Sequence, residues 1–189
     1  MRVVVVGTSG SGKSTFAKAL ARAAGVPHLE LDAINWQAGW RDLAIHEPEA
    51  FFRRVADAAA GEAWVIDGNY SKVRDALWPR ATAFVWMDPE RWTVMRQVIW
   101  RSFNRAITKK ELWPGTGNKE QFRRWLDAEH PIRWAWTHWP SNRARYGELF
   151  GAGGYDGRPA YRVGDRRDAR RLIAQLTQGE GAEGQPLPI

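Results

Sequence analysis

A glycine-rich segment near the start of the chain has the residue types and spacing of a phosphate-binding loop. Residues 7–14, GTSGSGKS, match the pattern G-x-x-x-x-G-K-[ST] directly after the apolar run 3–6. Glycine lets the backbone approach an anion closely, and the amide groups that open the following helix point at a phosphate. We expect Lys13 to span the β- and γ-phosphates of ATP and the Ser14 hydroxyl to ligate Mg²⁺. The residues expected to hold the nucleotide are Gly7, Ser9, Gly10, Ser11, Gly12, Lys13, Ser14 and Thr15.

Two carboxylates follow apolar segments and are candidates for the chemistry beyond nucleotide binding. Asp67 ends the run WVID, and we expect it beside the loop as the second contact of Mg²⁺. The alternative interpretation of Asp67 is an N-cap of the next helix. Asp32 follows the segment 28–31 and is a candidate base for an acceptor hydroxyl. If the acceptor is already a phosphate oxyanion, no base is needed, and Asp32 would only bind substrate or cap a helix.

Residues next to these carboxylates are candidates for contacts with the acceptor. Gly68 would let a substrate lie close to the backbone, and Asn69 and Tyr70 follow it directly. Trp36 and Trp40 lie in a polar segment, where tryptophan can stack on a flat or apolar ligand. Packing of both rings on the domain is an equally good interpretation, because the chain has twelve tryptophans.

A pair of arginines precedes a segment that is rich in proline and glycine. Arg101 and Arg105 are four residues apart, so they share one face of the expected helix. The loop 107–118 that follows could close as a lid and bring both cations to the transferring phosphoryl group. Exposed helix charges are the alternative interpretation. Arg123 and Arg124, after the loop, are weaker candidates for the same role.

Strands and helices alternate along the chain, which predicts a three-layer α/β/α fold with a five-stranded parallel sheet. Strands are expected at 2–6, 28–31, 64–66, 83–87 and 160–163, and helices at 14–24, 48–60, 71–78, 91–106, 119–129, 132–150 and 167–177. The segment 32–44 is expected to be a loop. We expect one domain over 1–178 with a lid at about 101–125, and a disordered tail at 179–189. Ligands of this fold bind at the carboxyl ends of the strands.

Composition narrows the possible functions. The 189 residues include no cysteine, which excludes a disulfide framework, a thiolate zinc site and a cysteine nucleophile. No apolar run is long enough for a membrane span, and we expect a cytoplasmic protein. The formal charge is +7, and its excess lies between residues 91 and 145, where twelve basic residues face four acidic ones. Such a field suggests a nucleotide or a nucleic acid as partner, although a solvated helix surface is the plain alternative.

Histidine and tryptophan offer less specific signals. His28, His46, His130 and His138 have no metal-ligand spacing, and we expect them to be structural. Four tryptophans between residues 125 and 139 alternate with arginines, a pattern that can bind single-stranded nucleic acid. We favour the interpretation that these residues are the core and the surface of the same helices.

The segments GTSGSGKST, LDAINWQAGW and WVIDGNY together resemble the small adenylate-kinase-like P-loop proteins, often labelled topology modulation proteins or AAA family ATPases. The resemblance covers nearly the whole chain. It implies a nucleoside-monophosphate-kinase-like fold with sheet order 2-3-1-4-5, lid arginines at Arg101 and Arg105, and contact of Asp165 and Arg166 with adenine. Adenylate kinases usually follow Asp-Gly with an aromatic residue, Pro and Arg that bind the acceptor nucleotide. Asn69 and Tyr70 stand there in this chain, so the resemblance leaves AMP open as the acceptor.

Three functions are compatible with these observations. The first is an ATP-dependent kinase that uses Mg²⁺ and acts on a nucleotide or another small molecule. The second is a nucleic-acid-binding or regulatory P-loop ATPase that uses the basic segment. The third is a nucleotide-gated interaction protein with negligible turnover.

Overall fold

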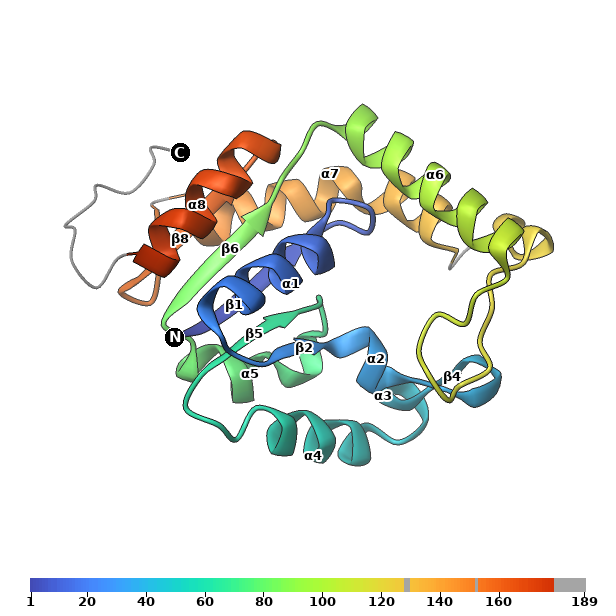
Figure 1. Cartoon of the computed structure of the whole chain (residues 1–189), viewed down its shortest axis with the longest axis horizontal. Coiled ribbons are helices and arrows are strands. Elements are labelled where there is room, and N and C mark those ends of the chain that lie inside the picture. Colours follow the sequence, from blue (N-terminus) through green and yellow to red (C-terminus); the bar gives the residue numbers. More distant parts are fainter. Residues whose placement is uncertain (128–129, 152, 179–189) are drawn as a thin grey trace.

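The computed structural model describes residues 1–127, 130–151 and 153–178, so the tail expected at 179–189 lies outside the described residues. Five parallel strands run in the order β2 (His28–Glu30), β5 (Trp64–Asp67), β1 (Arg2–Gly7), β6 (Ala83–Met87) and β8 (Arg158–Val163) (Figure 1). This order is the expected 2-3-1-4-5. A sixth strand, β7 (Gly154–Tyr155), pairs antiparallel with β8 and was not expected. Asp156 and Gly157 form the turn between them, both at positive φ, as an Asp-Gly hairpin turn requires.

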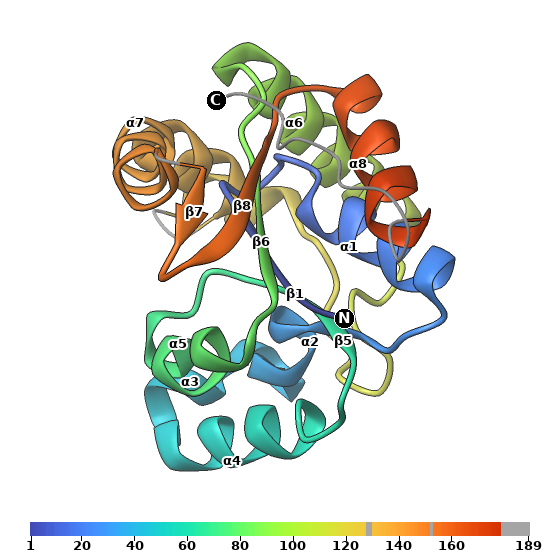
Figure 2. The same cartoon turned by 90° about the vertical axis from the view of Figure 1, so that its left-hand side faces the viewer.

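The central strand shows how the sequence builds three layers. Val3 and Val5 of β1 face the core beneath α1 (Lys13–Ala24) and α8 (Arg166–Gln178). Val4 and Val6 face the opposite core, beneath α4 (Pro48–Ala58), α5 (Arg74–Leu77) and the end of α7 (Pro131–Phe150). A strand that is buried on both faces needs a continuous β-branched run, which the four valines supply. Figure 2 shows helices on both sides of the sheet.

The long helix α6 (Arg91–Thr108) lies at one edge of the molecule and leads into the lid (Figure 1). Its residues Val94, Met95 and Val98 pack on Ala135 of α7. The helix ends at Lys109, which has a left-handed φ of 48°. None of the helices within the described residues is long and apolar enough to cross a membrane.

The segment 32–44, expected to be a loop, is largely regular. It holds α2 (Leu31–Asn35), the hairpin strands β3 (Trp36–Gln37) and β4 (Arg41–Asp42), the 3-10 helix η1 (Ala38–Trp40) and α3 (Leu43–His46). The buried side chain of Asn35 accepts a hydrogen bond from the backbone N–H of Ala44 at 2.7 Å. Asp42 caps α3 through the N–H of Ile45. These two polar side chains stabilise short elements that lack the apolar periodicity from which a helix is usually predicted.

The helix expected at 119–129 was also wrong. Glu111 and Lys119 form an antiparallel bridge, and the N–H of Leu112 donates to the carbonyl of Asn118, so the lid contains a short hairpin. The chain is therefore extended at 119, and up to residue 127 only the 3-10 helix η4 (Phe122–Leu126) follows. Residues 128 and 129 of the expected helix lie outside the described residues. The helix expected at 71–78 is broken into η2 (Ser71–Val73), α5 and η3 (Trp78–Arg80).

Candidate active site

The phosphate loop is packed closely between β6 and α6. Gly7 has a φ of 145°, and a Cβ on it would lie 2.5 Å from the carbonyl oxygen of Met87. Gly10 has a φ of 85°, and its Cβ would lie 2.8 Å from the Cβ of Val98. Gly12, at a φ of 94°, is the N-cap of α1. Glycine therefore fits this loop for two reasons, backbone angle and space, and the open amide groups at the start of α1 suit an anion. The other expected nucleotide contacts, Ser9, Ser11, Ser14 and Thr15, lie in the loop or in the first turn of α1.

Side chains from distant parts of the chain hold this loop. The amide of Asn69 donates from Nδ2 to the carbonyl of Gly7 at 2.7 Å and accepts at Oδ1 from the N–H of Gly7 at 3.3 Å. Arg101 of α6 donates to the hydroxyl of Ser9 at 3.2 Å. Both ends of the Asn69 amide are bound to the loop, so this residue supports the phosphate loop, and its expected contact with the acceptor stays a prediction.

Charged side chains of both signs surround Lys13. Its Nζ donates to the carbonyl of Thr8 at 3.3 Å. Burial lowers the pKa of Lys13, while the nearby carboxylates of Asp67 and Asp32 raise it and the guanidinium of Arg101 lowers it. The structure thus brings together four residues that the sequence placed in the site, from α1, β5, α2 and α6.

Asp67 is almost fully buried and uses both carboxylate oxygens. Oδ2 accepts the hydroxyl of Ser14 at 2.5 Å, and Oδ1 lies 2.7 Å from Nε2 of His28. A hydroxyl and a carboxylate in contact are the hard oxygen ligands that Mg²⁺ prefers, so Ser14 and Asp67 fit the predicted metal position. His28, expected to be only structural, contacts this pair. The feature that could have placed His28 at the site is the strand register. His28 pairs with Val65, whose side chain lies on the same face of the sheet as Asp67.

Asp32 lies in α2 rather than at the end of a strand, because β2 ends at Glu30. Its exposed carboxylate accepts the hydroxyl of Tyr70 at 2.8 Å. Burial and the charge of Asp32 raise the pKa of Tyr70, which therefore stays a protonated donor. Gly68 has a φ of 143°, and a Cβ on it would lie 2.8 Å from the Cβ of Leu31. The close packing of β5 against α2 thus requires this glycine even without a substrate.

The two lid arginines lie on the same face of α6, near the phosphate loop. Burial lowers the pKa of Arg101 to about 10, and the charge of Arg105 lowers it too, while Asp32 and Glu120 act in the opposite direction. The Nε of Arg101 is buried without a hydrogen-bond partner. Arg105 has no ion-pair partner among the residues that the structure describes. Two neighbouring cations with unused donors are suited to binding a phosphate.

The expected substrate tryptophans contact the lid. Trp36 stacks on Trp113 of the lid hairpin with ring centroids 6.3 Å apart, and Trp40 meets both rings edge-on at 5.9 and 6.0 Å. Asn118 accepts the backbone N–H of Trp40 at 2.9 Å. The guanidinium of Arg124 lies 4.1 Å from the ring centroid of Trp40. These contacts, which we call the tryptophan clasp (Trp36, Trp40 and Trp113), join the lid to the segment between β2 and α4.

Glu30 is a site residue that the sequence analysis missed. It ends β2, pairs in register with Asp67 and accepts the indole N–H of Trp113 at 3.4 Å. Burial raises the pKa of Glu30, and the nearby charge of Asp67 raises it further. No local pattern identifies Glu30, since only the pairing of β2 with β5 brings it to the site.

The residues expected at the adenine have local roles in α8. Asp165 accepts the backbone N–H groups of Arg167 at 2.7 Å and Asp168 at 2.9 Å, an N-cap arrangement. These backbone hydrogen bonds lower the pKa of Asp165. Arg166 is the first residue of α8 and is exposed.

Tryptophans that alternate with arginines after the lid are covered by the protein's own groups. The guanidinium of Arg91 lies 3.8 Å from the centroid of Trp136, that of Arg143 lies 4.9 Å from Trp139, and Trp134 stacks on His138 at 4.6 Å. Rings with such partners offer less surface to a nucleic-acid base, which weighs against that interpretation.

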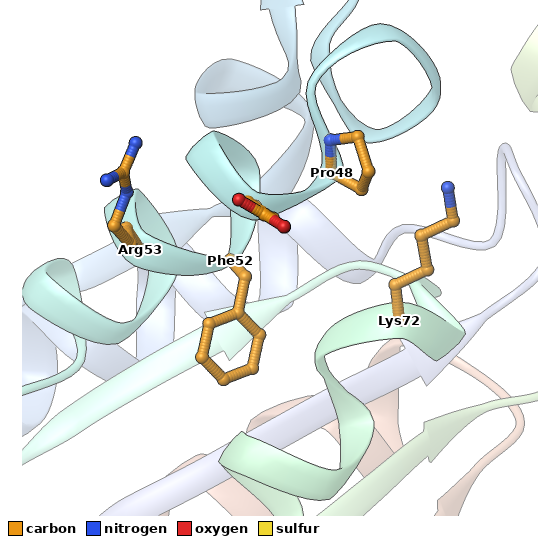
Figure 3. Close-up of a pocket in the computed structure, with 5 residues that line it drawn as sticks. Pro48, Phe52, Arg53 and Lys72 are labelled. Atoms are coloured by element: carbon orange, nitrogen blue, oxygen red, sulfur yellow. The ribbon is translucent and has the colours of Figure 1, made fainter.

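Of two surface pockets, one lies outside this group of residues and the other includes Trp36. One, of about 520 Å³, is lined by Pro48, Glu49, Phe52, Arg53 and Lys72 (Figure 3). It lies on α4 and η2 and holds none of the expected site residues. The other, of about 500 Å³, reaches from Trp36 to the lid turn at Pro114, Gly115 and Thr116.

No protein-family model and no curated protein matches this chain. Solved structures are similar to it over nearly the whole length. Shikimate kinase from Acinetobacter baumannii in complex with shikimate is 19 % identical with a TM-score of 0.56, over 96 % of this chain and 95 % of that chain. Shikimate kinase from Bacteroides thetaiotaomicron is 16 % identical with a TM-score of 0.54, over 94 % and 97 %.

A gluconokinase from Sinorhizobium meliloti 1021 is 19 % identical with a TM-score of 0.52, over 95 % of this chain and 94 % of that chain. These likenesses show the fold, that of the small P-loop kinases related to nucleoside-monophosphate kinases. The finer resemblance to adenylate kinases stays a prediction.

Proposed function

We propose that this protein is an ATP-dependent kinase that transfers the γ-phosphoryl group of Mg-ATP to a hydroxyl group of a small molecule. The observation that carries the proposal is the meeting of Lys13, the Ser14–Asp67 pair and Arg101 at one glycine-rich loop, with Asp32 beside them. Binding of a nucleotide and Mg²⁺ would account for Lys13, Ser14 and Asp67, so Asp32 and Arg101 are the residues that favour phosphoryl transfer. The structural neighbours named as shikimate kinase and gluconokinase support a small-molecule acceptor. A cytoplasmic location stays a prediction.

In this mechanism the loop amides and Lys13 bind the phosphates, and Arg101 and Arg105 neutralise charge on the group in transfer. Ser14 and Asp67 would hold Mg²⁺, which when bound offsets phosphate charge. Asp32 accepts the proton of the acceptor hydroxyl, and Tyr70 orients that carboxylate by its hydrogen bond. The lid hairpin covers the site and excludes water.

The test is transfer from γ-labelled ATP to a panel of shikimate, gluconate, neutral sugars and nucleoside monophosphates. We expect a labelled sugar or hydroxy acid, and Asp32→Asn should lower kcat by about 10²–10⁴ with ATP binding kept. Asp57→Asn, an exposed carboxylate of α4, is the matched control and should leave kcat unchanged. Intact ATP binding without transfer to any acceptor would count against the proposal. Transfer to nucleotides alone would instead support the prediction of an adenylate-kinase-like enzyme.

A further inference from the structure

The outer face of α6 is unusual because it is as apolar as the face that packs on α7. Trp92, Trp100 and Ile107 are 77, 63 and 57 % exposed, and Ile99 and Phe103 are also exposed. At 3.6 residues per turn these five positions fall within a sector of about 100°. The buried residues of the helix lie on the other side. Large exposed apolar side chains gathered on one helix face usually mark a surface that another molecule covers, so this outer face indicates a contact that the chain alone does not make.

Three aromatic side chains at this face contact one another. Trp100 and Phe103 stack with ring centroids 6.0 Å apart, and Phe103 meets Phe122 of η4 edge-on at 6.2 Å. Phe122 is itself half exposed. We call this surface, made by Trp92, Ile99, Trp100, Phe103, Ile107 and Phe122, the α6 stripe. It runs along a helix of about 27 Å at the edge of the molecule (Figures 1 and 2).

The charges along α6, between the flanking Glu90 and Glu111, are all of one sign. Residues 91–110 contain six basic and no acidic residues. Arg96 is exposed within the apolar sector, while Lys109 and Lys110 are exposed at its end. Arg101 and Arg105 lie on the opposite side, toward the phosphate loop. A partner that covers the stripe must therefore offer an apolar region to the aromatic side chains and negative charge to the cations next to them.

We propose that the α6 stripe binds an anionic lipid surface, with its aromatic side chains in the interface and its cations at the headgroups. Trp, Phe and Ile on one face, together with Arg and Lys, are the composition of helices that lie in a membrane interface. Within the stripe the hydrogen-bond donors are Arg96 and the indole N–H groups, with Lys109 and Lys110 at its end, whereas protein interfaces rely on many such bonds.

Two other occupants fit less well. A second copy of the chain would place two acid-free cationic helices together, with no carboxylate of α6 to offset the repulsion. A single-stranded nucleic acid would need ring faces free for bases, but Trp100 and Phe103 stack on each other and the two isoleucines have no ring. This inference is independent of the proposed kinase activity.

The experiment measures binding of the full chain to vesicles of phosphatidylcholine alone and to vesicles with about a third phosphatidylglycerol. We expect binding only to the anionic vesicles, weakened by salt. The double variant Trp100→Ser, Phe103→Ser should bind at least about tenfold more weakly. Trp136→Ser is the matched control, since this tryptophan is 53 % exposed but lies on α7, and its binding should be unchanged.

Quenching of wild-type tryptophan fluorescence by brominated lipids gives a reading that needs no variant, because Trp92 and Trp100 would enter the lipid. Arg96→Glu, which leaves the apolar residues in place, should also weaken binding. Equal binding to both vesicles, or none, overturns the proposal. The proposal is also overturned if the wild-type protein forms a dimer in solution and the double variant does not. Binding of oligothymidylate that the double variant abolishes would overturn it as well.

Discussion

Replacing Asn69 by alanine separates a supporting role from a substrate-binding role. The change removes both hydrogen bonds to the backbone of Gly7, a buried residue at the start of the phosphate loop. An unpaired buried donor or acceptor costs about 1–3 kcal/mol, so the loss of both is expected to cost about 2–6 kcal/mol. For a chain of this size that lowers Tm by roughly 4–24 °C. ATP affinity should fall as well, because the first loop residue is no longer fixed.

The assay is chemical unfolding together with ATP titration. Asn69→Asp keeps the acceptor for the N–H of Gly7 but places a negative oxygen against its carbonyl, so it should be at least as destabilising as alanine. Asn104→Ala, at an exposed position of α6, is the control and should change stability by less than about 0.5 kcal/mol. If Asn69→Ala unfolds like the wild type and only raises KM for the acceptor, the supporting role is refuted.

Three further changes test other parts of the site. Burial raises the pKa of Glu30, so the folded state holds the proton more tightly and loses stability as pH rises through the interval between the unfolded and folded pKa values. Glu30→Gln should therefore raise Tm at pH 8 but leave it unchanged at a pH below about 4, the pKa of a glutamate in the unfolded chain. An equal gain at both pH values would contradict this. Arg101→Ala should lower kcat by about 10²–10³, whereas Arg96→Ala, exposed on the same helix, should stay within about twofold; equal losses would reject a specific role. Gly10→Ala should cost about 1–3 kcal/mol and abolish ATP binding. Gly115→Ala, at nearly the same φ but with open space, should cost only backbone strain of about 1 kcal/mol, as denaturant titration of both variants can show.

Local sequence patterns were sufficient for the central sheet. The four valines of β1 and the WVID run of β5 mark buried strands by composition, whereas the order of the strands was implied by the family resemblance. Residues adjacent in sequence to the loop or to a strand end, such as Lys13 and Asp67, could be assigned in the same way. Positions defined by pairing over long distances could not. Glu30 contacts Trp113 across 83 residues, and no local signal relates them.

The sequence offered two interpretations of Trp36 and Trp40, as stacking groups for a ligand or as anchors packed on the protein. The tryptophan clasp supports the second interpretation, although the rings pack on the lid rather than on the core. If Trp113 moved out of the clasp, Trp36 and Trp40 would lose their ring contacts with the lid, and Glu30 would lose its indole donor. That loss removes a hydrogen bond that favours the ionised form of Glu30, a carboxyl group already raised in pKa by burial. The position of the lid and the charge next to Lys13 would thus be linked through one indole N–H, because Glu30 is among the carboxylates whose charge raises the pKa of Lys13.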